Sequence, residues 1–178
     1  MDSLYIICGT NRPNSNSSKL SSIVSALCNE LNIDHQEYSV NEHSQFLSQE
    51  AIYDRVKLIP ELIPIRESLI RTQYFIFVVP EYNGSFSGIF KLWIDAISIH
   101  KRNELFAGKK ILFVGLADGQ FGNMRGIDHL IAIFRYMGSI IFPKTFYLPQ
   151  CSAQLSSYNH EAEWVLRLKN TLKEFHEF

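Results

Sequence analysis

The chain lacks the features that mark several large classes of protein. Only three of its 178 residues are cysteine, and no two of them have CxxC spacing. An odd and small number of cysteines argues against a disulfide framework, and their spacing argues against a zinc site. The six histidines are scattered and form no close cluster with cysteine or aspartate. We therefore expect neither a structural nor a catalytic metal.

The chain also has neither a large excess of charge of one sign nor a long apolar run. Seventeen basic and eighteen acidic residues leave a formal net charge of −1, which gives no basic field for nucleic acid or anionic membranes. The apolar run of residues 4–8 follows an acidic start and is too short for a signal sequence or a membrane span. We therefore expect a cytoplasmic protein without nucleic-acid or membrane partners.

Two common nucleotide-binding motifs are absent too. The sequence contains no GxxxxGK[ST], which disfavours a Walker-type ATPase or GTPase, and no GxGxxG dinucleotide fingerprint. The first apolar segment ends in Cys8 and not in a carboxylate, which argues against a phospho-receiver domain. What is present is an ordinary globular balance, 46% hydrophobic and 20% charged, in a length that suits one domain over residues 1–178.

Apolar segments typical of buried strands alternate with helical stripes. Strands are predicted at residues 4–8, 35–40, 74–79, 110–116 and 140–148, the last interrupted by Pro143. Apolar residues recur at helical spacing over residues 20–31, 63–71, 89–97, 127–134 and 164–175. Residues 41–60 show no clear period and are expected to form a loop with a turn of helix.

This alternation predicts an α/β fold whose parallel sheet is covered by helices on both faces. Five strands and five helices match a flavodoxin-like, doubly wound, five-stranded sheet of order 2-1-3-4-5, although periodicity alone does not exclude a Rossmann order. Ligands bind such sheets beyond the carboxyl ends of the strands where the winding reverses, here between the first and third strands. The loops after Cys8 and after Val79 are therefore the candidates for a site.

The first of these loops, residues 9–18, is rich in hydrogen-bonding side chains. It combines the tight turn of Gly9, several hydroxyls and amides and the guanidinium of Arg12, and it leads into a helix. Hydroxyl and amide side chains, a guanidinium and the N-terminus of a helix together form a suitable binding site for a phosphate. Helix capping alone would explain Ser17. The loop has more donors than capping requires, so we favour phosphate binding.

The second loop, residues 80–88, gives a buried strand an unexpectedly polar end. Pro80 is expected to end the strand ladder, and the Asn83-Gly84 pair permits positive φ angles. Backbone turned in this way can face a planar heterocycle, with Tyr82 as an aromatic wall. A plain turn with a solvated Glu81 is an equally good interpretation of the loop by itself. Its place at the expected switch point favours binding.

Three segments together resemble the NAD(P)H-dependent FMN reductase family, which includes quinone, chromate and azo-dye reductases. Residues 9–20, GTNRPNSNSSKL, resemble its GSxRxxSxNxxL phosphate loop, and residues 80–98, PEYNGSFSGIFKLWIDAIS, resemble its PEYNxSxPGxLKNxxD segment. Residues 115–126, GLADGQFGNMRG, resemble its third loop, usually SxGxxGG. The sequence departs from the pattern with Thr10 for Ser, Ser17 for Asn, Leu92 for Asn, Asn123 for the second Gly, and no proline before Gly88.

The resemblance implies a bound FMN and the residues that hold it. The phosphate would be held by Thr10, Arg12, Ser15, Asn16 and Ser17. The ribityl chain and ring would be lined by Pro80, Glu81, Tyr82, Asn83 and Gly84, and the far side of the ring would be closed by Asp118, Gly119 and Gln120. NAD(P)H would pass hydride to the flavin, and a quinone, azo compound or free flavin would then accept it, with ping-pong kinetics. No catalytic side chain is required.

The family also forms dimers, which implies a homodimer or a dimer of dimers. Ile133, Tyr136 and Met137 lie off the inward stripe of their helix and are candidates either for that interface or for extra core contact. Two other functions stay open. A flavin-binding electron carrier or sensor would bind FMN without NAD(P)H turnover. A nucleotide hydrolase or transferase would need a nucleophilic carboxylate in the cleft, for which Glu81 is the obvious candidate.

Other conspicuous side chains have plain structural interpretations. Lys91 and Asp95 are four residues apart and are expected to form a helix pair. Cys8 and Cys28 are expected to be buried apolar groups. His100 and His129 are expected at the surface or at an interface.

Overall fold

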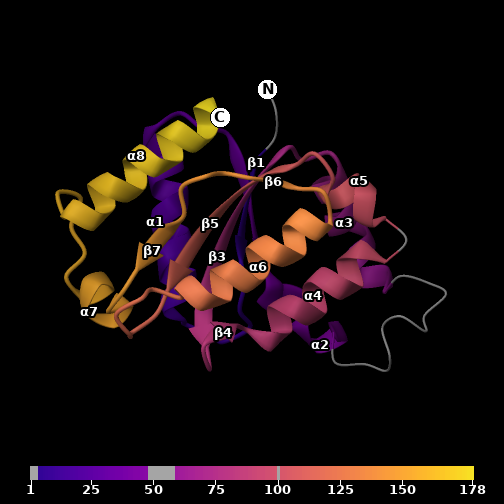
Figure 1. The fold of residues 1–178 in the computed structure, drawn as a ribbon, viewed down its shortest axis with the longest axis horizontal. Helices are drawn as coiled ribbons and strands as arrows, with labels where there is room; N and C mark the ends of the chain where they lie inside the picture. The colour runs from indigo at the N-terminus through magenta and orange to yellow at the C-terminus, as the bar shows by residue number, and fades with distance from the viewer. Residues whose placement is uncertain (1–3, 48–58, 100) are drawn as a thin grey trace.

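A parallel sheet forms the centre of the computed structural model, which describes residues 4–47, 59–99 and 101–178 (Figure 1). The sheet runs β2-β1-β3-β5, and both β6 and β7 pair with the far side of β5. The strands are β1 (Leu4–Cys8), β2 (His35–Ser39), β3 (Tyr74–Tyr82), β5 (Lys110–Leu116), β6 (Ile140–Ile141) and β7 (Phe146–Leu148). Because β6 and β7 are two parts of the predicted fifth strand, the flavodoxin-like order 2-1-3-4-5 is confirmed.

Helices cover both faces of this sheet. One face carries α1 (Asn16–Glu30) and α8 (Glu163–Glu177), and the other carries α3 (Ile63–Ile70), α4 (Gly88–Ser98) and α6 (Met124–Tyr136). The short elements are η1 (Val40–His43), α2 (Ser44–Leu47), η3 (Pro60–Leu62), β4 (Ser85–Phe86), α5 (Arg102–Phe106) and α7 (Cys151–Ser156). The part of 41–60 that the structure describes thus holds helical turns, and residues 48–58 lie outside the described residues.

The alternation of side chains along β3 builds both cores. Phe75, Phe77 and Val79 point into the core under α4 and α6, whereas Ile76 and Val78 point into the core under α1 and α8. The Phe77 ring lies 4.9 Å from the Phe134 ring of α6. A strand that is buried on both faces has a continuous apolar sequence, which is why residues 74–79 can be recognised as a strand from the sequence.

The prediction that Pro80 ends the strand ladder is wrong. Pro80 still pairs with Leu116 of β5, and β3 continues to Tyr82 because Glu81 and Tyr82 pair antiparallel with β4. Proline loses only its N–H donor, so it is tolerated at the margin of a sheet. Asn83 and Gly84 form the tip of this hairpin with φ angles of 51° and 76°, which confirms the predicted positive φ.

Two of the candidate interface residues at the end of the helix of residues 124–136 differ in their exposure to solvent. Met137 is 6% exposed and belongs to the core, whereas Tyr136 is 77% exposed. Met137 therefore makes extra core contact, one of the two roles left open for these residues, since the chain leaves the helix there and Gly138, with φ 86°, turns it back toward the sheet. No helix among the described residues has both the length and the apolar composition to cross a membrane.

Candidate functional site

The loop between β1 and α1 ends in a helix cap at the carboxyl edge of the sheet. Ser15 is the N-cap residue of α1, and its Oγ accepts the backbone N–H of Ser18 at 3.1 Å. Ser17 is 1% exposed and lies inside the helix. Capping therefore explains Ser15 and not Ser17, contrary to the sequence interpretation. Ser15 takes the Ser18 N–H, and the N–H groups of Asn16 and Ser17, which precede it in the first turn, have no acceptor within the helix.

The two candidate loops are bound to each other. The Gly9 N–H donates to the Val78 carbonyl at 2.9 Å, and the buried Ser87 hydroxyl donates to the Gly9 carbonyl. The Tyr82 hydroxyl lies 3.1 Å from Thr10 Oγ1. The loops after the first and third strands are thus adjacent, as the switch-point argument predicts.

Gly9 brings the β1–α1 loop close to α4. A Cβ atom at this position would lie 3.2 Å from the ring of Phe90, tighter than most real contacts. A larger residue at position 9 would therefore require the buried Phe90 ring to shift by a few tenths of an ångström.

A cavity of about 190 Å³ lies between these loops. The predicted residues that line it are Thr10, Arg12, Ser15, Asn16, Ser17, Pro80, Glu81, Tyr82 and Asp118. The predicted residues that do not line it are Asn83 and Gly84, which form the hairpin tip, and Gly119 and Gln120. The lining residues that sequence reasoning missed are Asn14, Leu116, Ala117, Cys151 and Ser152.

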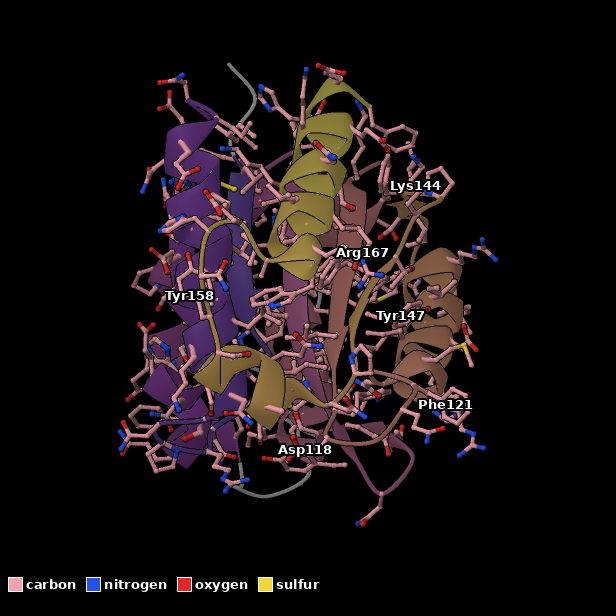
Figure 2. The ribbon with its side chains drawn as sticks, turned by 90° about the vertical axis from the view of Figure 1, so that its left-hand side faces the viewer. Asp118, Phe121, Lys144, Tyr147, Tyr158 and Arg167 are labelled. Carbon is pink, nitrogen blue, oxygen red and sulfur yellow. The ribbon has the colours of Figure 1, made fainter. Side chains whose placement is uncertain are left out.

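Asp118 gives the cavity a fixed negative charge. Its Oδ1 accepts the backbone N–H of Ser152 at 2.8 Å and the Cys151 thiol at 3.3 Å. Hydrogen bonding from the Ser152 side chain first, then from the Ser152 backbone N–H and the Cys151 thiol, lowers the pKa of Asp118, and the charge of Arg12 acts in the same direction. Figure 2 shows Asp118 at the end of the molecule where α7 lies. The charged lining residues are Arg12 as a cation and Asp118 with Glu81 as carboxylates.

Cys151 and Ser152 close the cavity at the start of α7. The Asn16 amide donates to Ser152 Oγ at 2.9 Å and to Cys151 Sγ at 3.4 Å. Burial raises the pKa of Cys151 to about 11, with the Asp118 carboxylate as a further cause, so the group is a thiol that can donate. No local sequence signal marks these residues, because they follow β7, outside the two loops that the switch-point rule selects.

The third loop keeps its backbone shape despite the departure at Asn123. Asn123 has φ 71°, a left-handed conformation that asparagine adopts more readily than other non-glycine residues. It is fully buried, and its Nδ2 donates to the Val79 carbonyl at 3.0 Å. The side chain therefore joins the third loop to β3 and does not line the cavity.

The remaining predicted side chains lie apart from the cavity. Lys91 and Asp95 form the expected helix pair at 2.7 Å. Cys8 and Cys28 are buried, as expected, and burial raises the pKa of both thiols. His129 is exposed and its Nδ1 lies 2.9 Å from Ser85 Oγ, whereas His100 lies outside the described residues. Within the part of the chain that the structure describes, no cluster of His, Cys, Asp or Glu could hold a metal ion.

The donor set fits the phosphate end of FMN. Hydroxyls, a guanidinium and a helix N-terminus converge on one cavity, and these are the groups that bind phosphate. The volume is below the 300–1,000 Å³ or so of pockets that enclose drug-sized ligands, so the cavity itself matches a phosphate and a short polar chain. Pro80 and Tyr82 add an apolar and aromatic wall to the same cavity.

Comparison with known proteins agrees with this chemistry. The sequence model of a family described as NADPH-dependent FMN reductase matches residues 3–153. A comparison with curated protein sequences found no match.

Solved structures of similar fold cover nearly the whole chain. One is the flavoenzyme NAD(P)H:(acceptor) oxidoreductase FerB from Paracoccus denitrificans, with a TM-score of 0.73 at 14% identity over 99% of this chain and 96% of that one. Another is the apo form of the NADH:FMN oxidoreductase EMOB, with a TM-score of 0.71 at 19% identity over 99% and 89%. A third is oxidised flavodoxin 1 from Bacillus cereus, with a TM-score of 0.64 at 13% identity over 99% and 98%. At these identities the likeness shows the fold.

Proposed function

Because the chain belongs to the NADPH-dependent FMN reductase family, we propose that it is an FMN-dependent NAD(P)H oxidoreductase. The observation that carries the proposal is the convergence of Arg12, the hydroxyl-rich start of α1 and the Pro80–Tyr82 segment on one cavity. The acceptor would be a quinone, an azo compound, free flavin or a similar molecule. The reaction would follow a ping-pong course.

In this proposal the protein binds and orients, and FMN supplies the redox chemistry by accepting a hydride from NAD(P)H and passing electrons on. Thr10, Ser15 and Ser17 offer hydroxyls to the phosphate, and Arg12 offers charge-assisted hydrogen bonds. The N-terminus of α1 adds backbone N–H groups and the positive end of the helix dipole.

The segment after β3 would serve the rest of the cofactor. Pro80 and Tyr82 lie beside the phosphate loop, and the Asn83-Gly84 tip turns backbone groups outward. Glu81 lines the cavity but pairs through its backbone with Phe86 in the β3–β4 hairpin, so a role as nucleophile is not required by the proposal. No side chain is assigned a catalytic role.

The test is the absorption spectrum of the purified protein after reconstitution with FMN, before and after anaerobic addition of NADPH or NADH. The proposal expects stoichiometric binding of FMN, bleaching of the flavin bands by a nicotinamide, and recovery of the bands on addition of a quinone. Bound FMN that neither nicotinamide bleaches would identify an electron carrier or sensor instead. A protein that binds no FMN would refute both.

A homodimer is part of the proposal. A groove of about 940 Å³ runs between α4, α5 and α6, with Ile94, Ile99 and Ile133 among the apolar side chains that line it. Tyr136 stands at this groove with the Arg102 guanidinium 5.1 Å from its ring centre. An apolar groove with a charged rim and an exposed aromatic residue is typical of a surface that packs on a second copy.

A further inference from the structure

The start of α7 has a place in the site that neither the family motifs nor the switch-point rule assigns. Cys151 and Ser152 follow β7, far in sequence from the three loops that resemble the family, yet both line the cavity. Cys151 is 4% exposed and Ser152 is exposed. Both bond to Asn16 and to Asp118, so this corner joins segments that are more than thirty residues apart.

The first connection fixes the beginning of α1. The Asn16 side chain donates to Ser152 Oγ at 2.9 Å and to Cys151 Sγ at 3.4 Å. Asn16 is the first residue of α1, and the first N–H groups of a helix are those that lack an intrahelical acceptor. Holding the Asn16 side chain therefore holds the backbone groups that a phosphate would meet.

The second connection holds the negatively charged Asp118 carboxylate in place. The Ser152 N–H donates to Asp118 Oδ1 at 2.8 Å, and the Cys151 thiol donates to the same oxygen at 3.3 Å. The carboxylate is thereby held at the start of α7, where it lines the cavity together with Arg12.

We propose that Cys151 and Ser152 form a positioning corner of the cofactor site, which orders Asn16 at the start of α1 and holds the Asp118 carboxylate in place at the cavity wall. The corner acts through these residues and does not itself bind the ring or the phosphate. This inference rests on the proposed function only in taking FMN as the ligand, since it concerns binding and not turnover.

The experiment compares FMN with riboflavin, which lacks the phosphate. Ser152→Ala removes the hydroxyl that accepts from Asn16, and with it the side-chain interaction with Asp118, and leaves the backbone bond to Asp118. Because one hydrogen bond is lost, the dissociation constant for FMN should rise about three- to tenfold, whereas that for riboflavin should not change. Ser152→Thr keeps the hydroxyl and should restore FMN binding. Both constants are measured by quenching of flavin fluorescence.

Ser156→Ala is the matched control. Ser156 is exposed in the same helix, its hydroxyl donates to the Ser152 carbonyl at 2.7 Å, and it does not line the cavity. This variant should bind FMN as the wild type does. Thermal unfolding of each flavin-free variant, followed by circular dichroism, checks that the fold is retained.

A double-mutant cycle tests the route through Asn16. If Ser152 acts through Asn16, the Asn16→Ala/Ser152→Ala double variant should bind FMN no more weakly than Asn16→Ala alone. Additive losses would overturn the proposal, as would an unchanged dissociation constant for Ser152→Ala or an equal loss for FMN and riboflavin. Wild-type protein that binds FMN without bleaching by NAD(P)H would refute the proposed function and leave this test intact. Absence of FMN binding would overturn both.

Discussion

Replacement of Asn123 separates the cost of a strained backbone from the value of one buried hydrogen bond. The residue has φ 71°, is fully buried, and donates from Nδ2 to the Val79 carbonyl at 3.0 Å. Alanine in this left-handed conformation costs about 1–2 kcal/mol, and glycine adopts it freely. Loss of the donor removes one buried hydrogen bond to a carbonyl that stays within the β3–β5 ladder, which costs about 0.5–1.5 kcal/mol.

These two costs predict that the wild type is the most stable protein, Asn123→Gly is less stable and Asn123→Ala is the least stable. The Oδ1 atom of Asn123 is buried and has no partner among the described residues, so removing the amide also removes one unfavourable burial. We therefore take the lower part of the hydrogen-bond range. Asn123→Gly should lower the free energy of unfolding by about 0.5–1 kcal/mol, and Asn123→Ala by about 1.5–3 kcal/mol because the backbone strain is added.

Asn32 provides the matched control. It is exposed, has φ 55°, and lies just beyond the end of α1. Asn32→Ala should cost only the backbone strain, about 1 kcal/mol, and Asn32→Gly should cost almost nothing because glycine is favoured at such helix ends.

The assay is urea unfolding of the flavin-free protein, followed by circular dichroism and analysed for both the midpoint and the slope. If Asn123→Ala were no less stable than Asn32→Ala, the bond to Val79 would contribute nothing and the reasoning would be refuted. If the glycine and alanine variants at position 123 were equally stable, the backbone part of the reasoning would be wrong.

Three other predictions concern the cofactor, acid stability and assembly. Arg12→Ala should raise the dissociation constant for FMN about tenfold or more and leave that for riboflavin unchanged, whereas Lys19→Ala, an exposed cation outside the cavity, should change neither in fluorescence titration. Hydrogen bonds from Ser152 lower the pKa of Asp118 below its ordinary 3.8, so its charged form adds stability above that pH, which is lost as the pH falls through the lowered value. Asp118→Asn should therefore lose less stability than the wild type below pH 3.8 in acid unfolding followed by circular dichroism. Ile133→Glu should place a charge in the α4–α6 groove and yield monomers in sedimentation, and a dimer of unchanged affinity would contradict the proposed interface.

Much of the fold could be predicted because the long apolar runs in the sequence are typical of one kind of structure, the buried strand. Residues 74–79 and 110–116 are long apolar runs, and only a doubly covered strand uses so many. The sheet order and the adjacency of the first and third loops followed from them. Short elements could not be predicted: α5 and α7 have too few residues to show a period, and β4 exists only because Glu81 and Tyr82 lie beside it.

The site shows the same division. The phosphate loop and the Pro80–Tyr82 segment could be identified because their residue types are unusual where they stand. Ser152 could not be identified, because an exposed serine at the start of a short helix has an ordinary explanation in capping. The cap of α1 was assigned to the wrong serine, since Ser15 and Ser17 are equally good caps until the helix start is known.

The class of fold, the family and the two loops that face each other follow from the amino-acid sequence, because hydrophobic periodicity and local loop chemistry are properties of neighbouring residues. Which side chains meet depends on the three-dimensional arrangement of the chain. Asn16, Asp118 and Ser152 come from three loops, and their hydrogen bonds exist because the carboxyl ends of β1, β5 and β7 reach one edge of one sheet. Such contacts depend on distance in space, which separation along the chain does not reveal.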